Sequence, residues 1–66
     1  MEYTKEELLE AKRQIDSALH KTERVVETFE AKTDPQRYKS QITLAKRRIE
    51  AFTIAGELIE RELDRL

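Results

Sequence analysis

Residues 32–35 read Lys-Thr-Asp-Pro, and they separate two long stretches that share one apolar period. Proline disfavours helical geometry in the residue before it, so Asp34 is placed to cap a helix that Pro35 begins. On each side of this break, seam residues recur every seven positions, as expected for one face of a helix. They are Leu8, Ile15, Thr22 and Phe29 before the break, and Tyr38, Ala45, Phe52 and Ile59 after it.

The two stripes match each other about the break. Phe29 and Tyr38 are equally far from it, and so are the pairs Thr22 with Ala45, Ile15 with Phe52, and Leu8 with Ile59. A short connection makes consecutive helices antiparallel neighbours. We therefore predict an all-α fold, a helical hairpin of two long antiparallel helices forming one domain over residues 1–66. The expected helices cover about residues 4–32 and 35–65, with the turn at about 32–35.

The start of the first helix has its own signal. Thr4 is followed three residues later by Glu7, which matches a capping box. Glu6, Glu7 and Glu10 also place negative charge near the positive end of the helix dipole. The pattern predicts that the helix begins directly after Thr4.

Size makes a lone hairpin difficult to stabilise. The chain has 66 residues, no cysteine and one histidine, so disulfides are excluded and a zinc site built by the protein is not expected. Small domains without such cross-links commonly gain stability by association. Charged residues make up 41% of the chain while the net charge is only −1, which is typical of solvated helix faces.

The second stretch carries more apolar surface than one partner helix covers. Leu44, Ala51, Ile54 and Leu58 lie outside the seam, and residues 51–59 are apolar on nearly all sides. We therefore predict a homodimer that forms a four-helix bundle. The residues expected to carry self-association are Leu44, Phe52, Ile54 and Leu58. Two alternatives stay open, a monomer with an exposed apolar flank and a hairpin that packs on an unrelated protein.

Basic residues gather near the turn. Lys32, Arg37, Lys39, Lys46, Arg47 and Arg48 fall in a segment whose acidic residue is Asp34, and the flanking segments are net acidic. This polarity suggests an alternative function, a nucleic-acid-binding accessory protein that uses Lys39, Lys46, Arg47 and Arg48. The simpler interpretation is a solvated face on which Lys46 and Arg47 pair with Glu50. In an antiparallel dimer, the opposite charges would instead guide subunit pairing.

The sequence predicts no catalysis. Its paired carboxylates lie on expected solvated faces, and no phosphate loop or nucleophile motif is present. Asp16 and His20 are four apart, but we interpret His20 as a solvent-facing residue, with no metal, cofactor or small-molecule substrate. The start lacks the features of a signal peptide, and no apolar run spans a membrane. We expect a small cytoplasmic interaction or regulatory module that does not bind membranes.

A resemblance extends these expectations. Its main stretch is Arg37-Tyr38-Lys39-Ser40-Gln41-Ile42-Thr43-Leu44-Ala45-Lys46-Arg47-Arg48-Ile49-Glu50-Ala51-Phe52. Together with Ile15-Asp16-Ser17 and Leu19-His20-Lys21, it resembles small uncharacterised helical-hairpin proteins of Gram-positive bacteria. The resemblance implies a bacterial, cytoplasmic and mobile-element-associated origin. It implies no activity, ligand or functional residue.

Overall fold

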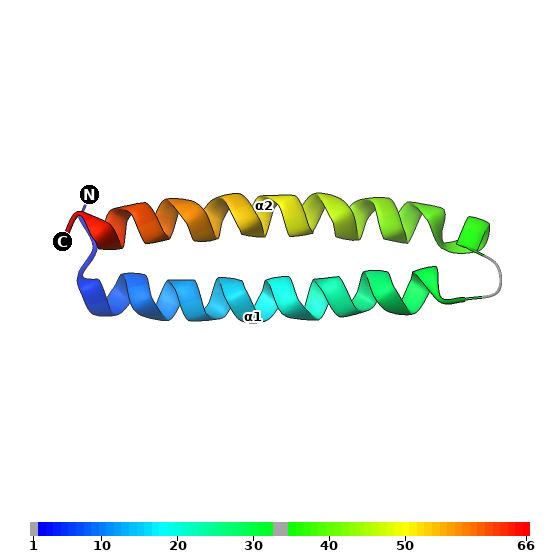
Figure 1. Ribbon diagram of the computed structural model, residues 1–66, viewed down its shortest axis with the longest axis horizontal. Coiled ribbons are helices and arrows are strands. Elements are labelled where there is room, and N and C mark those ends of the chain that lie inside the picture. The colour runs from blue at the N-terminus through cyan, green and yellow to red at the C-terminus, as the bar shows by residue number, and fades with distance from the viewer. Residues whose placement is uncertain (1, 33–34) are drawn as a thin grey trace.

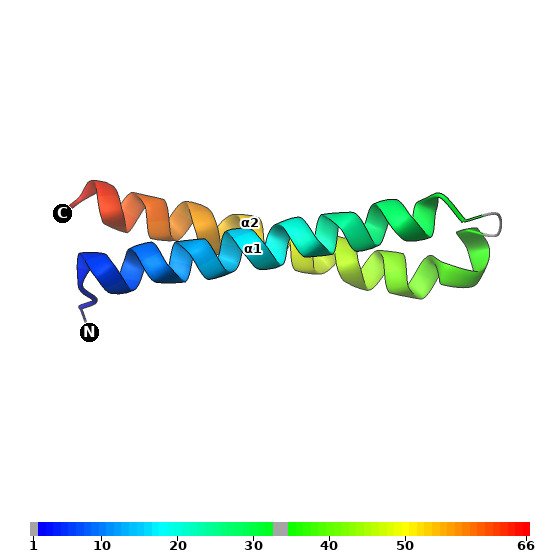
Figure 2. The same ribbon diagram turned by 90° about the horizontal axis from the view of Figure 1, so that it is seen from below.

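The computed structural model describes residues 2–32 and 35–66, and they form a helical hairpin (Figure 1). Helix α1 spans Lys5–Glu30, a short 3-10 helix η1 spans Pro35–Tyr38, and helix α2 spans Lys39–Asp64. The two α-helices run antiparallel along their whole length, so both chain ends lie at the end opposite the turn. The predicted all-α hairpin is therefore confirmed. Figure 2 shows that the helices cross near their middles, as in a heptad-based seam.

The predicted capping box at the start of α1 is confirmed. The Glu7 backbone N–H donates to Thr4 Oγ1 at 3.1 Å, and the Thr4 backbone N–H donates to Glu7 Oε1 at 2.9 Å. Both bonds satisfy groups that the first helical turn leaves without partners. The helix starts at Lys5 because Thr4 is extended while its side chain closes the first turn.

The start of α2 differs from the prediction. Residues Pro35–Tyr38 form the 3-10 helix, and the α-helix begins only at Lys39, with no side-chain cap at Tyr38. Asp34, the predicted cap, lies outside the described residues. The tighter 3-10 winding accompanies stacking of the Tyr38 ring on Phe29, with 4.9 Å between ring centroids and 25° between planes. The Arg37 guanidinium lies 5.9 Å from the same Tyr38 ring centroid.

The seam between α1 and α2 follows the predicted register. Phe29 stacks on Tyr38, Leu8 and Ile59 line one depression, and Thr22 and Ala45 line another. The core is nevertheless thin. Among the described residues, the buried apolar side chains are Leu8, Val26 and Ala45, and no large side chain is fully enclosed. Because the two helices touch along a single line, the other large side chains of the seam are only partly buried.

Gly56 lies buried in the seam without being required there. A Cβ built on it would meet Lys12 Cε at 3.7 Å, Ile15 Cγ2 at 3.9 Å and Asp16 Oδ1 at 4.0 Å. These are ordinary van der Waals distances, and the backbone of Gly56 is not left-handed. The geometry therefore indicates a tolerated helical glycine, because close approach of the helices does not require a residue without Cβ here.

Candidate self-association surface

A second apolar stripe runs along α2 outside the seam. We call it the outer stripe, and it consists of Leu44, Ala51, Ile54 and Leu58. Steps of seven, three and four residues keep these side chains on one helical face. Leu44 is 50% exposed, Ile54 51% and Leu58 56%, and Ala51 is also exposed. Helix α2 therefore has two apolar faces, of which the hairpin covers one.

Phe52 differs from the other predicted association residues. It is half-buried, and it lines one depression together with Leu19 of α1 and Gly56. Its side chain therefore belongs to the seam. The remaining three residues, Leu44, Ile54 and Leu58, are the ones that the structure brings together on an open face.

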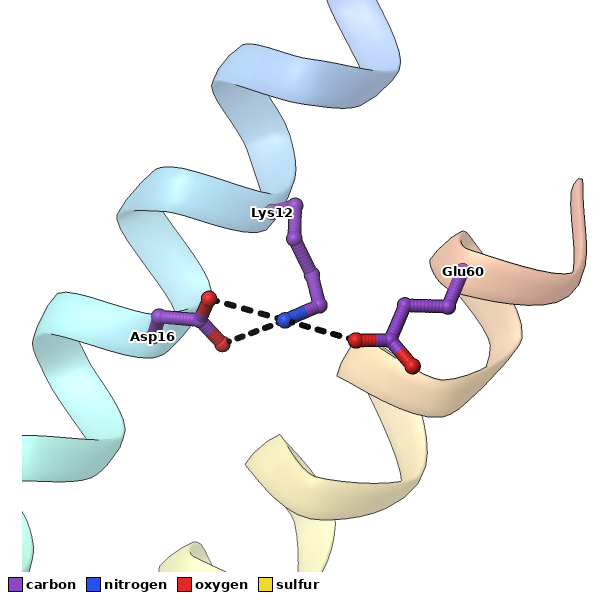
Figure 3. A network of polar contacts seen from close by, with 3 residues as sticks. All are labelled: Lys12, Asp16 and Glu60. Carbon is purple, nitrogen blue, oxygen red and sulfur yellow. Dashed lines mark hydrogen bonds and ion pairs between the residues drawn. The ribbon is translucent and has the colours of Figure 1, made fainter. Parts of the chain in front are cut away.

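Ion pairs join the helices on one flank of the seam (Figure 3). Lys12 of α1 reaches between its own helix and α2, with Lys12 Nζ 2.8 Å from each carboxylate oxygen of Asp16 and 3.2 Å from Glu60 Oε1. The hydrogen bond to Asp16, and then that to Glu60, raises the pKa of the Lys12 ammonium above its ordinary value of 10.5. Nearer the turn, Lys46 Nζ lies 3.5 Å from Glu30 Oε2.

The outer stripe lies away from this polar flank. Leu44 and Lys46 are two residues apart, which places them about 160° apart around α2, and the same holds for Leu58 and Glu60. The ion pairs therefore leave the stripe uncovered. On its side of the seam, Leu44 lines a groove with Val25 of α1 and Arg48. The apolar face thus continues from α2 onto α1.

Sequence reasoning missed how α1 contributes to this face. Val25 and Val26 are adjacent apolar residues of α1, yet Val26 is 7% exposed and Val25 is 43% exposed. Adjacent residues point about 100° apart on a helix, so only one valine can enter the seam. The available signal was the spacing of Leu19, Thr22 and Val26, three and then four residues apart. Tyr3 was also missed, and it lines an open apolar depression with Leu8, Ala11 and Ile59.

The surface area shows how much the hairpin leaves uncovered. The chain exposes 5587 Å², whereas a folded monomer of 7.8 kDa is expected to expose about 4,400 Å². Its Cα radius of gyration is 15.0 Å, against about 11 Å for a compact domain of this length. The surplus of roughly 1,200 Å² is larger than the ~800 Å² that each partner buries in a standard protein–protein interface.

The candidate nucleic-acid residues do not form one patch. Lys46, Arg47 and Arg48 are consecutive in α2, so they point in three directions about 100° apart. Lys46 pairs with Glu30 across the seam, not with the predicted Glu50. Arg48 lines the groove beside Leu44 on the other flank, and Lys39 lies with Lys46 beside Ile42. All four basic residues are exposed, with Lys39 and Lys46 on one side of α2 and Arg47 and Arg48 pointing in two other directions.

His20 is exposed, and its predicted neighbour Asp16 pairs with Lys12. Within residues 2–32 and 35–66, no three histidine, cysteine or carboxylate side chains lie close enough together to hold a metal ion. In the same described ranges, neither helix combines the length and the apolar character needed to cross a bilayer.

The chain was compared with protein-family models, curated proteins and solved structures, and none of them matches it. The resemblance of residues 37–52 to helical-hairpin proteins of Gram-positive bacteria therefore stays a prediction. The geometry of the outer stripe is the basis for any functional conclusion.

Proposed function

We propose that this chain is a small non-catalytic interaction module that works as a homodimer. In this proposal, two hairpins pack through the outer stripes of their α2 helices and form a four-helix bundle. Leu44, Ile54 and Leu58 supply the apolar contact, and Val25 extends it onto α1. A regulatory or scaffolding role follows from presenting a paired, charged helical surface to other cellular components.

The observation that carries this proposal is that three aliphatic side chains on one face of α2 are half exposed. The chain also exposes more surface than a folded monomer of its mass is expected to expose. Burying such a side chain completely stabilises a protein by about 1.5–3 kcal/mol, so the half left open on each residue is worth about 1 kcal/mol. Six of these residues meet in a symmetric pair. Closed two-fold dimers are the commonest oligomers, and they bury the same patch from both copies.

Sedimentation equilibrium of matched variants tests the proposal. Leu58→Asp places a charge in the outer stripe, and we expect it to raise the dimer dissociation constant by at least about 30-fold, because both copies lose the contact. Leu9→Asp makes the same chemical change at an exposed leucine of α1, 46% open and outside the stripe. That control should keep the mass of the unaltered dimer. Equal behaviour of the two variants would remove the stripe from the interface.

Nucleic-acid binding through Lys39, Lys46, Arg47 and Arg48 is the alternative, and its support is the net positive charge of the turn half. Residues 17–49 carry eight basic and four acidic side chains, whereas the rest of the chain carries five basic and ten acidic side chains. Because the four candidates point in three directions around α2, they suit phosphate contact less well than a single patch. The test is retention on DNA or RNA at low salt, with Lys46→Glu/Arg47→Glu as the matched variant. Retention of the native chain that this variant loses would support the alternative.

A further inference from the structure

We propose that the two α2 helices of the dimer run antiparallel, with the two-fold axis passing beside Ala51. This inference rests on the proposed function and adds the orientation of the second copy. Leu44 and Leu58 each lie seven residues from Ala51, on opposite sides of it. An axis at Ala51 therefore brings Leu44 of one copy against Leu58 of the other, twice. Ala51 meets its own equivalent, where a small side chain permits close helix approach.

The apolar residues alone do not choose this orientation, because a parallel pair would also match leucine with leucine. The distribution of charge along α2 favours the antiparallel orientation. Before Ala51, the helix carries Lys39, Lys46, Arg47 and Arg48 against Glu50. After Ala51, it carries Glu57, Glu60, Glu62 and Asp64 against Arg61. The two halves of α2 therefore have net charges of equal size and opposite sign.

Antiparallel pairing places the basic half of each helix against the acidic half of its partner. Parallel pairing would place basic against basic and acidic against acidic, which opposes association. Arg47 shows the difference most directly, because it lies on the same helical face as the outer stripe, three residues after Leu44 and four before Ala51. In the parallel arrangement, the Arg47 side chains of the two copies would face each other. In the antiparallel arrangement, it faces the half-buried Ala55, where its aliphatic stem has room to pack.

Cysteine cross-linking tests the orientation cleanly, because the native chain has no cysteine. The variants are Ala51→Cys, Leu44→Cys and Leu58→Cys, oxidised at a concentration where the unaltered chain is dimeric. We expect Ala51→Cys to cross-link to itself and a mixture of Leu44→Cys with Leu58→Cys to cross-link to each other. Leu44→Cys alone should not, because its two copies lie about 21 Å apart along the axis, beyond the reach of a disulfide.

Each outcome of this experiment decides something. Efficient cross-linking of Leu44→Cys alone and Leu58→Cys alone would overturn the antiparallel orientation while leaving the outer stripe as the interface. Absence of every cross-link, including that of Ala51→Cys, in a sample that sediments as a dimer would overturn both the orientation and the stripe. A chain that sediments as a monomer overturns the proposed function itself. Circular dichroism of each variant establishes that it is still helical.

Salt dependence of the unaltered chain is an independent readout that needs no variant. Exposed opposite charges attract less as ions screen them, with a Debye length of about 10 Å at 0.1 M. We expect the dimer dissociation constant to rise on the order of tenfold between roughly 20 and 300 mM sodium chloride. A dissociation constant that falls over this range would indicate like charges side by side, and it would contradict the antiparallel arrangement.

Discussion

The inner and outer faces of α2 resemble each other in sequence and differ in the structure. Ala45, on the inner face, is 6% exposed, and Gly56, farther along the same face, is also buried. Leu44, one residue earlier and on the outer face, is 50% exposed. Both faces repeat at heptad spacing, but only the inner one has α1 packed against it. The comparison teaches that heptad spacing identifies a contact surface without saying which chain supplies the contact.

The largest expected effect comes from opening the inner face. Phe52→Ala removes a large half-buried side chain from the seam, and we expect the free energy of unfolding to fall by about 2–3 kcal/mol, below the range for a fully buried phenylalanine. Because the seam lies within one chain, the loss should be the same at every protein concentration. Urea titration at two concentrations measures it. A loss that appears only in concentrated samples would place Phe52 in the dimer contact after all.

The outer face should respond differently. Leu58→Ala removes an open leucine, and we expect a loss of about 1–2 kcal/mol in samples concentrated enough to form the dimer. In dilute samples, the loss should be smaller, because Leu58 is already 56% exposed in the single hairpin. The same urea titrations measure this difference. Equal losses at both concentrations would mean that Leu58 stabilises the single hairpin.

Gly56 offers a way to strengthen the inner face. Gly56→Ala should raise the free energy of unfolding by about 1 kcal/mol, because alanine has the higher helix propensity and its Cβ finds ordinary contacts at 3.7–4.0 Å. Thermal unfolding at fixed concentration measures the gain. A destabilised variant would show that the space around Gly56 is smaller than these distances indicate, so that the added methyl group forces the helices apart.

The smallest expected effect concerns the ion pairs of the polar flank. The folded chain raises the pKa of Lys12 above 10.5 through Asp16 and Glu60, so the folded state holds this proton more tightly than the unfolded state. Its stabilising contribution is therefore complete below pH 10.5 and is lost as the pH rises through the folded value. Lys12→Gln should be slightly less stable than the native chain at pH 8 and equal to it in strong alkali.

Exposed Lys21 supplies the control for this pH profile. Lys21→Gln should show no such convergence, and urea titrations across the pH range compare the two variants. If Lys12→Gln stays less stable by the same amount at every pH, the contribution of Lys12 comes from packing of its stem and not from its charge.

Much of the hairpin was predictable because it depends on periodicity and on local backbone chemistry. The capping box of Thr4 and Glu7 uses neighbours in sequence, and the register that stacks Phe29 on Tyr38 follows from equal distances to the turn. The 3-10 start of the second helix was not predictable, because a 3-10 turn and an α-helical turn differ by one residue in hydrogen-bond spacing and no residue pattern here distinguishes them.

The polar contacts across the seam also could not be predicted from the residue spacing within each helix. Lys46 was expected beside Glu50 and instead pairs with Glu30, and Lys12 was not singled out although it joins both helices. A long flexible side chain can pair with any oppositely charged group within reach. Spacing along one helix does not show which groups of the other helix lie within that reach.

Leu44, Ile54 and Leu58 were predicted to lie outside the seam, and they are exposed. Phe52 was predicted both for the seam and for self-association, and the structure places it half-buried with Leu19 and Gly56.

The most direct test of a hairpin that needs a second copy is the concentration dependence of its melting. If folding and pairing are coupled, a hundredfold rise in protein concentration should raise the melting temperature by about 10 °C, given about 0.7 kcal/mol of unfolding enthalpy per residue in both chains. A melting temperature that stays constant over this range, in a chain that sediments at 7.8 kDa throughout, would contradict the account.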